Sequence, residues 1–123
     1  MKNVLVIEDN SDNMRLITYA LKRSGYEVIS AGSGEEGVEI FRKERPSLVI
    51  VDINLPGIDG FEVTRRIRNS EGGDAVPIVA ITSHAMLGDR ELVFSAGCTA
   101  YFEKPIDPIT IVDKIHQAIG VTQ

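Results

Sequence analysis

Acidic side chains stand where two short apolar runs of this 123-residue chain end. The run Val4–Ile7 is followed by Glu8 and Asp9, and the run Leu48–Val51 is followed by Asp52. Clustered carboxylates raise one another's pKa unless a cation lies between them. Oxygen ligands without histidine or cysteine favour a hard cation, and an incomplete carboxylate set is typical of Mg²⁺. The three acids therefore predict a magnesium site, provided that the fold brings them together.

Two further apolar runs end in groups that suit phosphate chemistry. The run Ile78–Ile81 is followed by Thr82 and Ser83, and Lys104 comes shortly after Ala100–Phe102. Each polar group alone could be the solvent-facing end of a strand, but the whole set shares one expected sheet edge. Carboxylates, a divalent cation and an ammonium group are together the parts of a site in which a carboxylate attacks phosphorus in line.

Five apolar runs at roughly even spacing predict the strands that would position these groups. Three of them are continuously apolar and rich in β-branched residues, as in strands buried on both faces of a parallel sheet. The second and fifth runs are shorter and more polar, which favours the sheet edges. In chain order the runs are Val4–Ile7, Val28–Ile29, Leu48–Val51, Ile78–Ile81 and Ala100–Phe102.

Helical periodicity separates the runs. Ser33 and Glu36 form a capping-box pattern, and Asp107 and Pro108 are predicted as the N-cap and first residue of the last helix. The predicted helices are Asn13–Ser24 with Gly25 after it, Ser33 to before Pro46, Asp59 through Ile67, Met86–Ala96 before Gly97, and Asp107 through Ile119. The order, a βα unit repeated five times, predicts a three-layer α/β sandwich around a five-stranded parallel sheet.

Composition favours one acidic domain over residues 1–123. Hydrophobic residues make up 43% and charged residues 25%, and the net charge is −5. This balance argues against direct binding of nucleic acid or an anionic membrane, which needs a basic face. The single cysteine, Cys98, excludes a disulfide framework, and no apolar run could span a bilayer. We expect a cytoplasmic protein.

Glu8–Asp9, Asp52, Thr82 and Lys104–Pro105, in this order on a fivefold βα pattern, resemble the receiver domain of two-component response regulators. The resemblance covers essentially the whole chain and implies a flavodoxin-like doubly wound fold and a stand-alone regulator. It implies that Asp52 is the phosphoacceptor and that Lys104 pairs with the phosphoryl oxygens. It also implies a cis peptide bond between Lys104 and Pro105.

The resemblance further implies a metal site and a switch. Glu8, Asp9, Asp52 and the backbone carbonyl of Asn54 would hold Mg²⁺, for which Mn²⁺ could substitute. Thr82 would swing to bond the phosphoryl group and Tyr101 would turn inward, and Asn54 and His84 would tune the dephosphorylation rate. Each has a structural alternative: Thr82 as a strand-end filler or cap, Tyr101 as core and His84 as a solvated residue. Ser83 replaces the usual alanine and is small enough to leave the pocket open.

The implied partners are a sensor histidine kinase or histidine phosphotransfer protein and a downstream protein target. The target would bind the fourth helix, fifth strand and fifth helix, about Met86 to Ile119. The protein would be a monomer or a phosphorylation-dependent dimer, and it would catalyse only its own phosphorylation and dephosphorylation. His116, on the last helix, is predicted to lie at the surface. From the short tail after that helix we expect no attached output domain.

Three other functions compete. Gly32–Gly37 reads G-x-G-x-x-G with Asp52 further on, like a dinucleotide fingerprint, but Glu35 and Glu36 would repel a pyrophosphate and Ser33 would cap the helix. A Mg²⁺-dependent phosphohydrolase would use Asp52 as nucleophile, but the second acid of its D-x-D motif is absent. A receiver that only docks would lack one of the acids or the lysine, and all are present.

Overall fold

The computed structural model describes residues 2–83 and 89–120. In these residues strands alternate with helices throughout, as predicted. The strands are β1 (Asn3–Ile7), β2 (Glu27–Ala31), β3 (Leu48–Asp52), β4 (Ile78–Thr82) and β5 (Ala100–Glu103). The helices are α1 (Ser11–Arg23), α2 (Gly34–Glu44), α3 (Gly60–Arg68), α4 (Asp89–Ala96) and α5 (Ile111–Ile119). None of the helices in the described ranges has the length and apolar character needed to cross a membrane.

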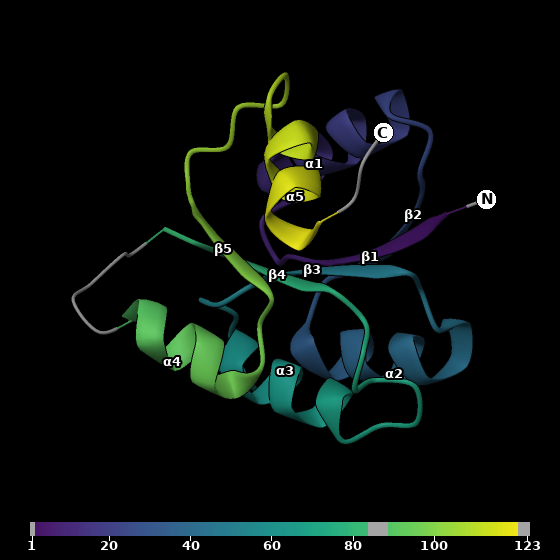
Figure 1. Ribbon diagram of the computed structural model, residues 1–123, viewed down its shortest axis with the longest axis vertical. Coiled ribbons are helices and arrows are strands. Elements are labelled where there is room, and N and C mark those ends of the chain that lie inside the picture. Colours follow the sequence, from purple (N-terminus) through teal and green to yellow (C-terminus); the bar gives the residue numbers. More distant parts are fainter. Residues whose placement is uncertain (1, 84–88, 121–123) are drawn as a thin grey trace.

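The described strands form one parallel sheet in the order β2-β1-β3-β4-β5. Helices α1 and α5 cover one face, and α2, α3 and α4 cover the other (Figure 1). The predictions of a three-layer doubly wound fold, and of β2 and β5 as its edges, are confirmed. Strand order reverses between β1 and β3, which is where ligands bind in open parallel sheets.

The sheet has an apolar core on each face. Along β1, Val4 and Val6 pack against α1 and α5, whereas Leu5 and Ile7 pack toward α2 and α3. Strands β3 and β4 alternate in the same way. Because neither face of these strands is solvated, their sequences are continuously apolar. This burial holds the carboxyl ends of the central strands in fixed positions.

One helix, α1, begins where the apolar periodicity does not show it. Helix α1 begins at Ser11 instead of Asn13, because Asn10 is its N-cap and accepts a hydrogen bond from the Asn13 N–H at 3.0 Å. The first turn of α1 is polar, so an apolar stripe cannot locate it. For α4, the predicted start at Met86 lies outside the described residues, and the helix ends before Gly97 as expected.

The prediction that Asp107 caps the last helix is wrong. Helix α5 begins at Ile111, with Thr110 at its N-cap. The Asp107 carboxylate accepts a hydrogen bond from the Ile109 N–H at 2.9 Å and so closes a turn that contains Pro108. Asp and Pro favour turns as strongly as helix starts, and the sequence motif does not distinguish the two.

The prediction that His116 lies at the surface is also wrong. Its side chain is 5% exposed, and its Nε2 lies 2.7 Å from the hydroxyl of Tyr26, which precedes β2. A buried histidine needs such a polar partner. The partner comes from the other end of the chain, so the pattern of α5 alone could not reveal it.

Candidate functional site

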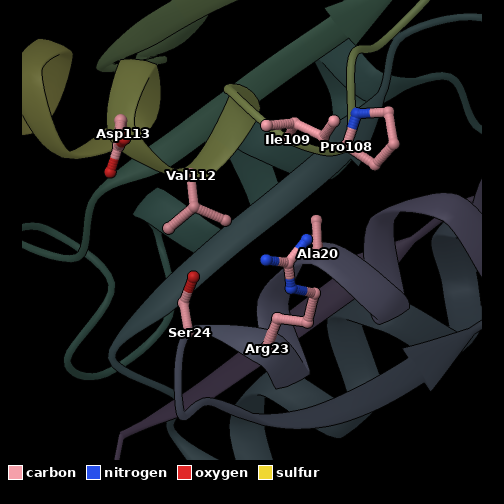
Figure 2. A pocket seen from close by; sticks show the side chains of 7 residues that line it. All are labelled: Ala20, Arg23, Ser24, Pro108, Ile109, Val112 and Asp113. Atoms are coloured by element: carbon pink, nitrogen blue, oxygen red, sulfur yellow. The ribbon is translucent and has the colours of Figure 1, made fainter.

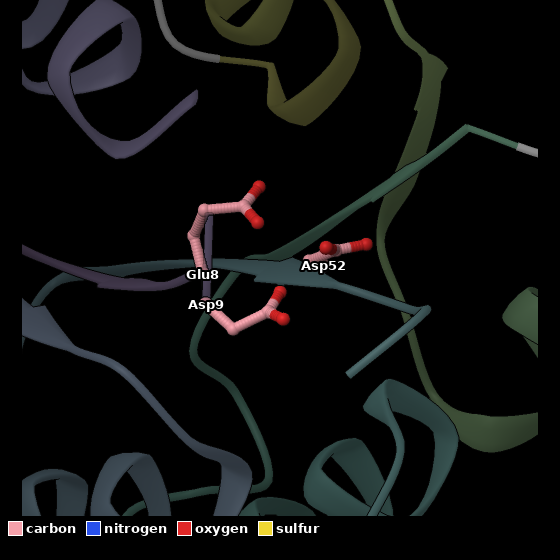
Figure 3. Close-up of side chains that lie close together, drawn as sticks. All are labelled: Glu8, Asp9 and Asp52. Atoms are coloured by element: carbon pink, nitrogen blue, oxygen red, sulfur yellow. The ribbon is translucent and has the colours of Figure 1, made fainter. Parts of the chain in front are cut away.

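The fold brings the three acids of β1 and β3 together. One carboxylate oxygen each from Glu8, Asp9 and Asp52 lies within 4.8 Å of the others. Figure 3 shows the three side chains at the sheet edge where β1 and β3 end. Glu8 and Asp52 are buried and Asp9 is exposed. The cluster therefore lies at the reversal point of the strand order and is open to solvent through Asp9.

Lys104, from the end of β5, supplies the positive charge of the cluster. Its ammonium nitrogen lies 3.0 Å from Glu8 Oε1 and 3.1 Å from Asp52 Oδ2. Burial alone would lower the pKa of Lys104, but the two carboxylates outweigh burial and raise it. The lysine thus remains charged and links the buried acids of two neighbouring strands.

The Glu8 carboxyl has an unusual proton affinity. Its pKa is raised to about 7, chiefly by burial and further by Asp52, against the opposing effects of Lys104 and the Asn10 N–H. That N–H donates to Glu8 Oε2 at 3.1 Å. A divalent cation at the cluster would favour the ionised form of Glu8. The side chains of the cluster all offer carboxylate oxygens as ligands, which suit a hard ion. The acids present therefore fit Mg²⁺.

Asp52 is held by a partner on each oxygen. The backbone N–H of Asn54 donates to Oδ1 at 3.0 Å, and Lys104 donates to Oδ2 at 3.1 Å. The residue is only 4% exposed. Each carboxylate oxygen has about two lone-pair sites, so both keep capacity for a further bond. Asp52 is a fixed, charge-compensated carboxylate in the buried part of the acidic cluster.

The end of β4 adjoins this carboxylate through Asn54. The Thr82 hydroxyl donates to Asn54 Oδ1 at 3.0 Å, and the N–H and hydroxyl of Ser83 lie 3.3 Å from the same oxygen. The contact between Ser83 and Asn54 could not be predicted from the sequence, which shows only that Ser83 is small. Nothing along the chain shows that the Asn54 side chain turns toward β4. The signal available is the sheet register, in which Asp52 pairs with Ile81.

The other predicted residues lie around this centre. Tyr101 is half-buried and packs against the core on the α2–α3–α4 side of the sheet. The Lys104–Pro105 peptide bond is cis, as predicted. His84 lies outside the described residues, so its predicted role has no structural test.

The glycine-rich segment between β2 and α2 serves packing. A Cβ added at Gly37 would collide with Ile7 of β1, and one at Gly34 would lie 2.6 Å from side chains of α3 and the loop before it. The predicted cap is present, since Ser33 Oγ accepts from the Glu36 N–H at 3.2 Å. The glycines therefore bring α2 close to the sheet. The backbone N–H of Glu36, in the first turn of α2, already has Ser33 as its hydrogen-bond partner.

A separate pocket of about 190 Å³ lies between α1 and α5 (Figure 2). It is lined by Ala20, Arg23, Ser24, Pro108, Ile109, Val112 and Asp113. None of the predicted phosphate or metal residues is among them. The chemistry that the sequence predicts therefore belongs to the acidic cluster and not to this pocket.

Comparisons with known proteins agree with this geometry. The sequence matches the family described as response regulator receiver domain over residues 4–116. The polar-differentiation response regulator DivK of Brucella ovis is 38% identical over 119 residues, which cover 97% of each chain.

Solved structures give the same result. The chemotaxis protein CheY4 of Vibrio cholerae superposes with a TM-score of 0.90 at 26% identity, covering 96% of this chain and 98% of that one. The receiver domain of the sensor histidine kinase PA1611 of Pseudomonas aeruginosa, with a magnesium ion coordinated in its active site cleft, has a TM-score of 0.87 at 34% identity. That match covers 97% of this chain and 98% of the other. The chain therefore belongs to the response regulator receiver domains, phosphorylation switches of two-component signalling that bind Mg²⁺ at an acidic pocket.

Proposed function

We propose that Asp52 accepts a phosphoryl group from the phosphohistidine of a sensor histidine kinase or a histidine phosphotransfer protein. Glu8, Asp9, Asp52 and the backbone carbonyl of Asn54 would hold the Mg²⁺ ion, and residues 1–123 would act as one receiver domain. One observation carries the proposal: Asp52 is a buried carboxylate that lies between two further acids and Lys104. The magnesium in the cleft of the PA1611 receiver domain supports the same assignment.

In the transfer, one oxygen of Asp52 forms a bond to phosphorus while the phosphorus–nitrogen bond of the phosphohistidine breaks. The imidazole leaves with the bonding electrons and takes up a proton, and Asp52 becomes an acyl phosphate. The charge of a bound Mg²⁺ would offset the negative charge of the transferred group. Water attack at phosphorus would later restore the carboxylate and release inorganic phosphate, at a rate tuned by Asn54 and His84.

Lys104 is the group that would respond first. Its ammonium already contacts Asp52 Oδ2 at 3.1 Å, so a phosphoryl group on Asp52 would place new anionic oxygens beside it. The ion pair with Glu8 would then compete with a pair to the phosphoryl group. Thr82 would donate to another phosphoryl oxygen, and the side chain of Tyr101 would turn inward.

The output would be a changed surface over α4, β5 and α5. Phosphorylation adds roughly −1.5 to −2 charges near neutral pH, by analogy with other phosphorylated side chains. Helix α4 presents large apolar side chains to solvent, Leu92 at 54% and Phe94 at 42% exposure. We propose that a downstream protein reads this face.

The experiment is phosphorylation by a small donor. Wild-type protein incubated with acetyl phosphate and Mg²⁺ should gain the mass of one phosphoryl group in intact-mass spectrometry. Hydroxylamine should remove that mass, as it does from an acyl phosphate. Asp52→Asn should gain nothing, and a chelator should abolish the gain in wild type.

Asp59→Asn is the matched control. Asp59 is an exposed carboxylate that caps α3, the helix that follows β3. Asparagine can keep that cap. This variant should be labelled like wild type. Label on Asp52→Asn equal to that on wild type, or wild type that takes no phosphoryl group from any small donor, would refute the proposal.

A further inference from the structure

Asn54 contacts both the proposed phosphoacceptor and the proposed switch residue. Its backbone N–H donates to Asp52 Oδ1 at 3.0 Å, and its side-chain oxygen accepts from the Thr82 hydroxyl at the same distance. Ser83 adds two donors at 3.3 Å. We call the contacts among Asn54, Thr82 and Ser83 the β3–β4 bridge.

The orientation of the Asn54 carboxamide follows from its partners. The Ser83 backbone N–H can only donate, so the atom that faces it must be the carboxamide oxygen. The proton of the Thr82 hydroxyl must then point at Asn54 as well. In the unphosphorylated protein the Thr82 proton is therefore directed to a neutral amide oxygen.

We infer that the Asn54 carboxamide competes with a phosphoryl group on Asp52 for the Thr82 hydroxyl, and that Ser83 eases this exchange by donating to Asn54 once Thr82 has left. The inference rests on the proposed phosphorylation of Asp52. It makes the side chain at residue 54 a determinant of the switching equilibrium, and it makes Ser83 a positioning residue.

The competition has a defined direction. Thr82 is 2% exposed, so its hydroxyl gains little from solvent and exchanges one protein acceptor for another. Hydrogen bonds to an ionised acceptor are about twice as strong as bonds between neutral groups. A phosphoryl oxygen should therefore displace the amide oxygen of Asn54, whereas the unmodified carboxylate already has Asn54 N–H and Lys104 as partners.

Ser83 decides what Asn54 loses in the exchange. A carboxamide oxygen has two lone pairs, and three donors now share it. Both Ser83 donors are at 3.3 Å, longer than the Thr82 bond, so they can shorten when Thr82 departs. The acceptor is then not left without a partner, which is the expensive outcome.

Two substitutions should consequently act in opposite directions. Asn54→Ala removes the competing acceptor, and affinity for beryllofluoride, a phosphoryl substitute, should rise about two- to tenfold. Ser83→Ala removes a replacement donor and a competitor of Thr82, and affinity should fall about twofold. Both side chains are exposed, so the variants should fold. General loosening of the site would lower affinity in both.

The measurement is a beryllofluoride titration with Mg²⁺, followed by NMR. In a Thr82→Ala background, neither substitution should change the affinity, because the contested hydroxyl is gone. Ser47→Ala is the matched control, since this exposed serine bonds the Asn3 carbonyl at the opposite end of β3. Weaker binding in Asn54→Ala, or effects that persist without the Thr82 hydroxyl, would overturn the inference.

A second readout needs no metal or phosphoryl group. Three-bond couplings of the Thr82 side chain report its χ1 rotamer in the free protein. Asn54→Ala should change them and Ser83→Ala should not. If wild type fails to bind beryllofluoride, the proposed function is wrong, and unchanged Thr82 couplings in Asn54→Ala separately refute the bridge.

Discussion

Two cations at opposite ends of the strands make very different contacts. Lys104 follows β5 and contacts two carboxylates, Glu8 and Asp52. Arg68, at the end of α3, instead donates to the backbone carbonyls of Gly73, Val76 and Gly97, which precede these strands. The shortest of these bonds, to Val76, measures 2.6 Å.

The difference separates a responsive contact from a fixed one. Carboxylates can take up protons, bind a metal or be esterified, so the partners of Lys104 can change. Backbone carbonyls do none of these. Burial lowers the pKa of Arg68, but a guanidinium is not deprotonated in proteins. The molecule therefore combines a rigid amino-terminal edge of the sheet with a carboxyl-terminal edge that can be rearranged.

Arg68→Ala should have the largest effect on stability. It would remove the donors of several carbonyls at once, and we expect the free energy of unfolding to fall by about 2–4 kcal/mol in urea denaturation. Arg66→Ala, two residues earlier, should change it far less because its ion pair with Glu62 is exposed. Labelling of Asp52 should survive in the folded variant. Equal stability of the two variants would contradict a fixed role for Arg68.

Lys104→Met should destabilise less, and reversibly. It would leave Glu8 and Asp52 without the hydrogen bonds of their cation, at about 1–3 kcal/mol in metal-free protein at pH 8. Mg²⁺ should recover much of this loss, because it provides another positive charge, whereas it should not rescue Arg68→Ala. Denaturation curves with Mg²⁺ and with a chelator test the contrast. Equal responses of the two variants to Mg²⁺ would contradict the difference proposed between Lys104 and Arg68.

A further effect is expected from a change of pH on the metal-free protein. The pKa of Glu8 is about 7 in the folded state against 4.5 ordinarily, so the folded state binds the extra proton between these values. The stability that this group contributes is complete below pH 4.5 and is lost as the pH rises through 7, by at most about 3 kcal/mol. Denaturation midpoints from pH 5 to 8 should decline more steeply in wild type than in Glu8→Gln. Parallel slopes would refute this.

Most of the fold could be predicted because its signals are local. The apolar runs of β1, β3 and β4 are uninterrupted since both faces are buried, and this also identified the edge strands. The start of α1 was harder because its polar first turn carries no periodicity, and the start of α5 was harder because an Asp-Pro pair suits a turn as well as a helix start. Asp107 shows the ambiguity, since a residue that suits a helix cap closes a turn instead.

The acidic cluster could be anticipated because strand ends fall at one edge of a parallel sheet. Glu8, Asp52 and Lys104 meet as that rule requires. What sequence could not supply is contact between side chains from separate elements. His116 is buried by Tyr26, and Ser83 reaches Asn54, and neither partner is near in the chain.

The close packing of α2 on β1 links residue 37 to the acidic cluster, which it does not contact. Gly37 lies so near Ile7 that even a methyl group there would have to displace it, and Ile7 immediately precedes Glu8. Alanine at residue 37 would thus displace the end of β1, and with it Glu8, without contacting any residue of the acidic cluster.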